Sequence, residues 1–440
     1  MPEAVCRMLT LLCALVRTLP IGTNLGLLHL LWMLTSGRLL ASRGAPFPGP
    51  ADGGVSARAV RRAWAALGQG DWTSAQLLGH WAAVITREGR WQPHTHSGYR
   101  PVAVDVTGCW RPRLHACPTT HDHQVAGRAL PAIPVGLIAR VGHVGAQRLA
   151  LPLAFVRADP ADPSPSAHAR PLVQEAVRQR ATDDILVLDA GFGVALLQAA
   201  GAPRYVVRLA KNATFRQAPP PAYGGRGRPP TRGAVVRPLS RTYRGRVRPA
   251  TRPDRVETWR EEAPLLRAEI GDTVVRADAD ADSPPFAVLA IHDPRFRAPL
   301  LLATPLPLPA RSLRDGYVDR WPIEQLPLAA KRLLGAARPC VHGPETCRRL
   351  PALTLLAGAV LSSAAATAPA IPTGFWDRHP QPTPGPLRRL RAGTPFPHDF
   401  PLPARIREKA TATSHRRTGF WGQRRPADAP TAPPALPEAA

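Results

Sequence analysis

The chain has 440 residues, which is long enough for two or three domains and a sizeable core. Its 57 Lys and Arg residues against 31 Asp and Glu residues give a formal net charge of +26, which predicts a polyanionic partner, either nucleic acid or an anionic membrane surface. Nearly all of the positive charge is arginine, a bias that a GC-rich genome also produces, so charge alone does not establish DNA binding. The six cysteines form no Cys-x-x-Cys pair, which argues against a zinc site or a disulfide framework and fits a reduced cytoplasm.

Roughly the first hundred residues are predicted to be helical. The apolar start is interrupted by Pro20 before it reaches a membrane-spanning length, so it is interpreted as two packed helices, the second from a cap at Asn24 to about Ser42. Apolar stripes at 60–67 and after Thr73 predict a further helix pair. The pair is either a helix-turn-helix with arginines near a DNA backbone or a small bundle whose arginines are solvated. These arginines are Arg58, Arg61 and Arg62.

From Arg100 the pattern changes to strands. PVAVDVTG is an apolar strand with one carboxylate, Asp105, in its middle, and a buried carboxylate requires a neutralising partner or a metal. The strands PVGLIARV and LALPLAFVR follow at hairpin-like spacing, and then the helix PLVQEAVRQRA. Asp189 ends the apolar strand of DDILVLDAGFG, which precedes a helix closed by Gly201 and the strand RYVVRL. This order is that of a ribonuclease-H-like core, where chemistry takes place at strand ends.

The segment LDAGFG has a second interpretation, as the glycine loop of a nucleotide- or methyl-donor-binding fold. Two departures disfavour this methyltransferase-like alternative. The next glycine position holds Ala195 or Leu196, and the following strand, YVVRLAKN, lacks an acidic residue to bind a ribose hydroxyl.

The long segment between Asp189 and the acidic residue Glu324 is predicted to be an inserted β-rich subdomain with an arginine-rich entrance. It begins with the Pro/Gly-rich linker QAPPPAYGGRGRPPTRG and continues through strand-like TWREEAPLLRAEI, TVVRADAD, FAVLAIHD and PLLLATPL. Its arginines are either a solvated linker or a surface that follows phosphates, and their density among few acids favours the second. The DNA-binding candidates at the entrance are Arg226, Arg228 and Arg232.

YVDRWPIEQLPLAAK, residues 317–331, carries four polar side chains at helical spacing: Tyr317, Arg320, Glu324 and Lys331. A solvated helix face with ordinary charge pairs is the alternative interpretation. Pro322 and Pro327 fall within the pattern, and proline is tolerated only in the first turn of a helix. We therefore expect Glu324 at or near a helix start. A buried helix is predicted from Leu350.

The sequence pattern Tyr-x2-Arg-x3-Glu-x6-Lys resembles, without a gap, the signature of the Y-R-E-K group of DDE-type insertion-sequence transposases. GRPP, RDGYVDRWPIEQ and IPTGFWDR are similar to segments that recur in these proteins, so the resemblance extends from about Arg100 to about residue 380. It implies a metal-binding and catalytic triad of Asp105, Asp189 and Glu324, and contacts from Tyr317, Arg320 and Lys331 to phosphates of the transposon end. Trp259 is the candidate for a tryptophan that stacks on a flipped base in the better-known members.

Three carboxylates share a small site as anions only when cations neutralise them, which is the logic of paired Mg²⁺ ions, with Mn²⁺ as a substitute. The resemblance implies cut-and-paste chemistry: hydrolysis at the element ends, then strand transfer by the freed 3′-hydroxyl. The implied partners are double-stranded DNA (terminal inverted repeats and target) and a second copy in a synaptic homodimer, in the bacterial cytoplasm at the nucleoid, without a membrane. The alternative is a transposase-derived DNA-binding protein that has lost catalysis, which the presence of all three acids disfavours.

The predicted fold class is α/β: a ribonuclease-H-like catalytic core interrupted by a β-rich insertion, with an N-terminal helical domain and a Pro/Arg-rich C-terminal tail. The expected divisions are 1–98 (helical, binding the DNA ends), 99–216 (core), 217–310 (insertion), 311–370 (core, with the Glu-bearing helix and the helix after it) and 371–440 (partly disordered, above all from about 423).

Overall fold

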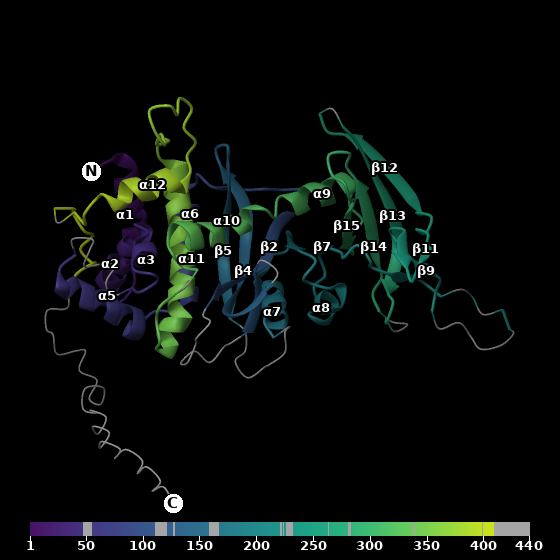
Figure 1. Ribbon diagram of the computed structural model, residues 1–440, viewed down its shortest axis with the longest axis horizontal. Coiled ribbons are helices and arrows are strands. Elements are labelled where there is room, and N and C mark those ends of the chain that lie inside the picture. Colours follow the sequence, from purple (N-terminus) through teal and green to yellow (C-terminus); the bar gives the residue numbers. More distant parts are fainter. Residues whose placement is uncertain are drawn as a thin grey trace, which may run out of the picture.

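Figure 1 shows the computed structural model of the chain, a mixed α/β molecule with helices at one end and strands extending to the other. Of residues 121–125 and 128–131 it describes the backbone only. The described residues are 1–46, 55–110, 121–125, 128–157, 167–220, 222, 224–225, 232–262, 264–279, 283–337, 339–397 and 399–408. The predicted disorder from about 423, Arg226, Arg228 and part of the predicted linker lie outside them.

The helices gathered at one end of the molecule (Figure 1) pack around one apolar cluster. Every residue of α2 is buried, because neighbouring helices surround it. The helix predicted from Leu350 is confirmed as buried. α11 is long and apolar enough to span a membrane, but 83% of its most apolar 18-residue stretch is buried inside the protein. The helices at this end are α1 (Glu3–Val16), α2 (Thr23–Thr35), α3 (Arg38–Ala41), α5 (Ala57–Gln69), α6 (Ser74–Glu88), α11 (Pro344–Thr367) and α12 (Pro384–Ala392).

Two details of this end differ from the prediction. Asn24 does not cap α2; Gly22 precedes the helix, and the Asn24 amide donates to the Arg405 carbonyl at 2.7 Å. The helix expected to reach Ser42 is broken at Gly37, whose left-handed φ of 76° separates α2 from α3. In the predicted helix pair, α5 packs against α2, and two of its arginines, Arg58 and Arg62, both pair with Glu408.

Within the described residues, thirteen strands form one mixed sheet. One of them, β2 (Arg100–Trp110), lies between β4 (Arg128–Val144), which is antiparallel to it, and β6 (Asp184–Leu188), which is parallel. β5 (Gln147–Arg157) forms a hairpin with β4, as predicted, and β7 (Tyr205–Arg208) runs parallel to β6. The order is therefore β5-β4-β2-β6-β7. Two short strands, β1 (Gln92–Pro93) and β3 (His121–Val125), also pair with β4.

Helices cover both faces of this central part. Val102 and Val104 of β2 face the helix α7 (Ala169–Gln179) in one apolar cluster, which also includes α8 (Val194–Ala199). Ala103, which alternates with them, faces Ile323 and Leu355 on the other side. β2 is thus apolar on both faces, so the polar Asp105 stands out within it.

β7 also pairs with β15 (Leu300–Thr304), so the β-rich segment continues the same sheet. It adds β14 (Phe286–His292), β13 (Leu265–Arg276) and β12 (Arg255–Arg260), with β8 (Phe215–Gln217) and β9 (Val235–Val236) beyond. The prediction of one strand for TWREEAPLLRAEI is wrong, because the chain turns at Glu262 and forms the hairpin β12–β13. TVVRADAD, expected as another strand, continues β13 past a bulge after Gly271. β10 (Arg241–Tyr243) and β11 (Arg246–Arg248) form a separate two-stranded ribbon.

Residues 317–331 do not form one helix. α9 (Ala310–Val318) ends after Tyr317, a turn follows, and α10 (Pro322–Leu328) begins with Pro322 in its first turn. Glu324 is in that first turn, so the expected helix start is confirmed. After Pro327, which has no N–H to donate, the chain widens into a π-helical turn, Ala329–Leu333, that carries Lys331. The prediction that the four polar side chains form one stripe on a single helix is therefore wrong.

Candidate active site

Three elements bring the predicted carboxylates together. The parallel pairing of β2 with β6 ends at Val104 and Leu188, and the next residue on each strand is Asp105 and Asp189, respectively. α10 packs against β2 and β4 through Ile323 and Leu326, which leaves Glu324 on the side of the two aspartates. Sequence positions far apart thus converge where the parallel pairing of β2 and β6 stops, at the end of β6 and partway along β2.

The Arg320 guanidinium lies between the three acids. Its Nη2 donates to Glu324 Oε1 at 2.5 Å and lies 3.8 Å from Asp189 Oδ2, and its Nη1 lies 3.8 Å from Asp105 Oδ2. The side chain is only 8% exposed, whereas Asp105, Asp189 and Glu324 are 24%, 38% and 32% exposed. A buried guanidinium of this kind requires the carboxylates around it.

Burial and charge act differently on the two aspartates. Burial raises the pKa of Asp105 to about 6, although Arg320 and the Val106 N–H oppose the rise. Burial also opposes ionisation of Asp189, but the Ala190 N–H, Arg320 and Arg208 outweigh it, so the pKa of Asp189 is lowered. Burial disfavours the charged form of Arg320, but the neighbouring acids outweigh it and raise the pKa of Arg320.

Tyr317 and Arg208 both donate hydrogen bonds to Asp189. The Tyr317 hydroxyl donates to Asp189 Oδ1 at 3.2 Å, and Arg208 Nη1 donates to the same oxygen at 3.5 Å. Burial, with the charge of Asp189, raises the pKa of Tyr317, so the phenol stays a donor at neutral pH. Arg208 was not among the sequence candidates; its only local signal is its place at the end of RYVVRL.

Lys331 lies at the edge of the site. Its ammonium is 5.3 Å from the centre of the Trp110 ring, a cation–π contact, and it interacts electrostatically with Asp105. Burial lowers the pKa of Lys331. It is half-buried against β2, whereas the resemblance implies a phosphate contact.

The acids suit a hard divalent cation in chemistry, because three carboxylates supply the oxygen ligands that Mg²⁺ prefers. Among the described residues, no three metal-ligating side chains lie close enough together to hold one ion. The space between the acids is taken by Arg320, whose Nη1 is buried without a hydrogen-bond partner in the described part of the chain. The donor chemistry fits Mg²⁺, but to hold an ion the acids would have to come closer together as well as lose the guanidinium between them.

A second cluster fixes the turn that carries Arg320. Asp319 Oδ2 accepts hydrogen bonds from His94 Nδ1 at 2.8 Å and His96 Nε2 at 2.6 Å, and Asp319 Oδ1 accepts one from Arg148 Nη2 at 2.7 Å. Burial opposes ionisation of Asp319, but its bonds to the two histidines dominate and lower its pKa. We refer to these four residues as the Asp319 clamp. Sequence reasoning missed it, because no spacing rule links its members.

A cavity of about 870 Å³ opens beside Tyr317. Its lining includes the basic side chains Arg208, Lys211 and Arg297 and the Phe296 ring, together with the acids Glu261, Asp293, Asp315 and Asp319. The Phe296 ring is 67% exposed, which is unusual for a phenylalanine. Sequence reasoning missed this cavity too, since its walls come from β14, the β14–β15 connection and α9.

The remaining sequence candidates are not part of this cluster. Trp259 lies on β12, half-buried against the apolar cluster that contains Leu313, and its indole N–H has no partner among the described residues. Its ring is packed, so it does not offer a free stacking face. Arg232 is exposed near β9, at the far end of the sheet.

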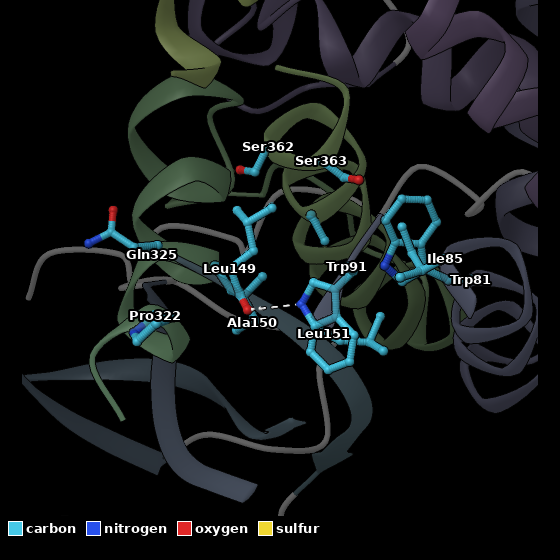
Figure 2. Close-up of a pocket in the computed structure, with 12 residues that line it drawn as sticks. Trp81, Ile85, Trp91, Leu149, Ala150, Leu151, Pro322, Gln325, Ser362 and Ser363 are labelled. Carbon is cyan, nitrogen blue, oxygen red and sulfur yellow. Dashed lines mark hydrogen bonds between the residues drawn. The ribbon is translucent and has the colours of Figure 1, made fainter. Parts of the chain in front are cut away.

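A small apolar pocket lies behind α10 (Figure 2). Pro322 and Gln325 of α10 face Trp81 and Trp91 across it, and Trp91 Nε1 donates to the Leu149 carbonyl at 3.3 Å. Its volume of about 30 Å³ has room for one or two water molecules, so we assign it to the packing that supports α10.

Comparison with models of known protein families finds none that matches this chain, and comparison with curated proteins finds no relative.

Proposed function

We propose that this chain is a DDE-type transposase of an insertion sequence, which cuts and joins DNA at phosphodiester bonds. The observation that carries the proposal is the convergence of Asp105, Asp189 and Glu324 on one buried guanidinium, from the middle of β2, the end of β6 and the start of α10. Three carboxylates placed in this way have little use in packing, because their burial is costly unless a cation neutralises them.

The topology supports the proposal. The strand order β5-β4-β2-β6-β7, with β2, β6 and β7 parallel and α7 and α8 as crossovers, is the order expected for a ribonuclease-H-like core. We propose that 99–216 and 311–370 form this core and that 217–310 is the insertion. LDAGFG, the basis of the methyltransferase alternative, leads into a helix of only six residues.

In the proposed mechanism, Asp105, Asp189 and Glu324 would hold two Mg²⁺ ions, whose chemistry there would be charge neutralisation and activation of the attacking oxygen. Tyr317 orients Asp189 through its hydroxyl. Arg320 and Arg208 are the cations next to the acids and are suited to bind the phosphates on either side of the cleaved bond. Lys331 adds positive charge on the side of Asp105.

Two surfaces are suited to the DNA itself. One is the cavity beside Tyr317, whose lining includes Arg208, Lys211, Arg297 and Phe296 as well as four acids. The other is the ribbon β10–β11, residues 241–248, which we refer to as the arginine ribbon. In the described part of the chain no acidic side chain pairs with its arginines, Arg241, Arg244, Arg246 and Arg248. Arg255, close by, pairs with both Glu257 and Asp272.

The arginine ribbon has the shape to lie along DNA. Arg244 and Gly245 at its tip both have positive φ, 50° and 73°, which gives the tightest kind of two-residue turn. Arg244 and Arg248 both lie over the Tyr243 ring, at 5.3 and 5.1 Å from its centre. The ribbon is almost entirely exposed, and an isolated two-stranded ribbon is marginally stable in water, so a polyanionic partner would stabilise it.

The wider assignments follow from the resemblance and are part of the same proposal. Residues 1–98 would bind the terminal inverted repeats, a homodimer would hold two ends together, and the protein would act in the bacterial cytoplasm at the nucleoid. The burial of α11 within the helical end supports a place away from membranes.

The test is cleavage of DNA that carries the short inverted repeats expected to flank the gene. Purified protein is incubated with this DNA and Mg²⁺ or Mn²⁺, and nicked and joined products are measured. We expect Asp189→Ala and Glu324→Gln to lose at least about a hundredfold in rate, while Glu175→Gln, a carboxylate on α7, retains the rate of the wild type. If the wild type binds the repeats but cleaves no better than Asp189→Ala, the chain is a DNA-binding descendant of a transposase.

A further inference from the structure

The three acids are neutralised by a residue of the protein itself. Arg320 is attached to Glu324 by one short hydrogen bond and to the two aspartates by contacts of 3.8 Å. Its Nη1 lacks a hydrogen-bond partner among the described residues although it is buried. The guanidinium therefore lies between the acids but forms a hydrogen bond with only one of them, Glu324.

A metal ion and this guanidinium exclude each other from the same position. A metal ligated by carboxylates from β2, β6 and α10 needs oxygens at about 2.0–2.1 Å, and the guanidinium now separates those oxygens. It also keeps its positive charge at any ordinary pH, so a divalent cation beside it would be repelled. Metal binding therefore requires Arg320 to turn away.

The backbone next to Arg320 is held in place by Asp319, so we expect a rearrangement of Arg320 to involve its side chain. The Asp319 clamp holds the turn by three hydrogen bonds of 2.6 to 2.8 Å. The Tyr317 ring lies 5.9 Å from the guanidinium carbon and also lines the 870 Å³ cavity. Tyr317 thus lies next to both the guanidinium and the cavity, where the proposed function places DNA phosphates.

We propose that Arg320 makes metal binding conditional on DNA: it occupies the space between the acids until a phosphate draws its guanidinium toward the cavity. A phosphate is a strong bidentate partner for a guanidinium, so it compensates for the lost carboxylate contacts. Metal and DNA then bind cooperatively, and because binding is reciprocal, the metal strengthens DNA binding by the same factor. The proposal rests on the proposed function for the identity of the phosphate, and on the Arg320 contacts for the coupling.

The experiment measures binding of Mn²⁺ by calorimetry to the wild type, Arg320→Gln and Arg208→Gln, without DNA and with a 20-base-pair duplex. Without DNA, we expect Arg320→Gln to bind Mn²⁺ at least about tenfold more tightly than the wild type. Arg208→Gln is the matched control: it removes the same charge from beside Asp189, but this arginine is 46% exposed and off-centre, so its effect should be below about threefold.

The duplex should raise the Mn²⁺ affinity of the wild type about tenfold and leave that of Arg320→Gln unchanged. Circular dichroism and thermal unfolding show whether the variant folds, and if it does not, the wild-type measurement alone decides the matter. Equal Mn²⁺ affinity with and without duplex overturns the inference while leaving cleavage, and so the proposed function, untouched. If neither protein binds Mn²⁺ and the wild type does not cleave DNA, both fail together.

Discussion

The hydroxyl of Tyr317 donates a hydrogen bond of 3.2 Å to Asp189 Oδ1, across 128 positions of the chain. It joins the end of α9 to the end of β6 and helps to keep Asp189 ionised. Two of the residues implied by the resemblance are thus coupled in the folded chain, one acting on the other directly.

Tyr317→Phe should reduce the rate of DNA cleavage by about tenfold, because Asp189 loses the donor that orients it. The free energy of unfolding should fall by only about 1 kcal/mol, the usual net contribution of one hydrogen bond. Single-turnover cleavage and urea unfolding measure the two effects. A variant that unfolds far more easily, or cleaves at the wild-type rate, would contradict the role assigned to the hydroxyl.

Mn²⁺ binding should weaken as the pH falls below 6. Burial raises the pKa of Asp105 to about 6, so the carboxyl is ionised above this pH and protonated below it. A metal must displace the proton, which reduces the apparent affinity by up to about tenfold for each pH unit below 6. Calorimetry at pH 5, 6, 7 and 8 checks this, with Asp105→Asn as the control that should lose the dependence. The same affinity at pH 5 and pH 7 would rule the prediction out.

Phe296 and Trp259 should respond in opposite ways to replacement by alanine. Trp259 is packed against the cluster around Leu313, so Trp259→Ala should reduce the free energy of unfolding by about 2–3 kcal/mol. Phe296 is an exposed residue of the cavity lining, so Phe296→Ala should leave stability within about 0.5 kcal/mol but weaken binding of single-stranded or unpaired bases by about 1–3 kcal/mol. Unfolding curves and fluorescence anisotropy with a duplex that carries an unpaired end provide both readouts. Equal DNA affinity for Phe296→Ala and the wild type would remove Phe296 from the DNA surface.

The residues that sequence reasoning located well carry a local signal. Asp105 and Asp189 interrupt or end apolar strands, and the prolines on either side of Glu324 fix where a helix begins. Periodicity does not indicate which side chains meet across the fold. The central position of Arg320 depends on the register that sets Val104 opposite Leu188, and a parallel register has no local signature.

The Asp319 clamp and Trp259 show the same limit. Asp319 lies 223 positions from His96 and 171 from Arg148, so only the folded chain brings them together. Trp259 lies on a strand whose side chains are exposed or half-buried. Whether its ring faces a packed cluster or open solvent depends on α9, which covers that face.

The arginine ribbon should account for a measurable share of the salt dependence of DNA binding. Each phosphate contact on duplex DNA contributes about 0.9 to the slope of log K against log salt, so replacing Arg244, Arg246 and Arg248 by glutamine should lower the slope by about 2 to 3. Arg178→Gln is the matched control, since Arg178 is 71% exposed but already paired with Glu175. Binding to a duplex of random sequence between 50 and 300 mM salt gives the slopes. A ribbon variant with the same slope as Arg178→Gln would show that the ribbon does not contact phosphates.

Asp319→Asn should separate positioning of Arg320 from the stability of the fold. Asparagine keeps the size of the side chain but loses the charge that attracts His94, His96 and Arg148, so the turn between α9 and α10 should loosen. Because Asp319 is largely buried with three donors, the free energy of unfolding should fall by about 1–3 kcal/mol. Arg320 then leaves the acids more easily, so Mn²⁺ should bind more tightly without DNA even though cleavage slows. A merely structural role predicts weaker Mn²⁺ binding and slower cleavage together, and calorimetry beside single-turnover cleavage distinguishes the two outcomes.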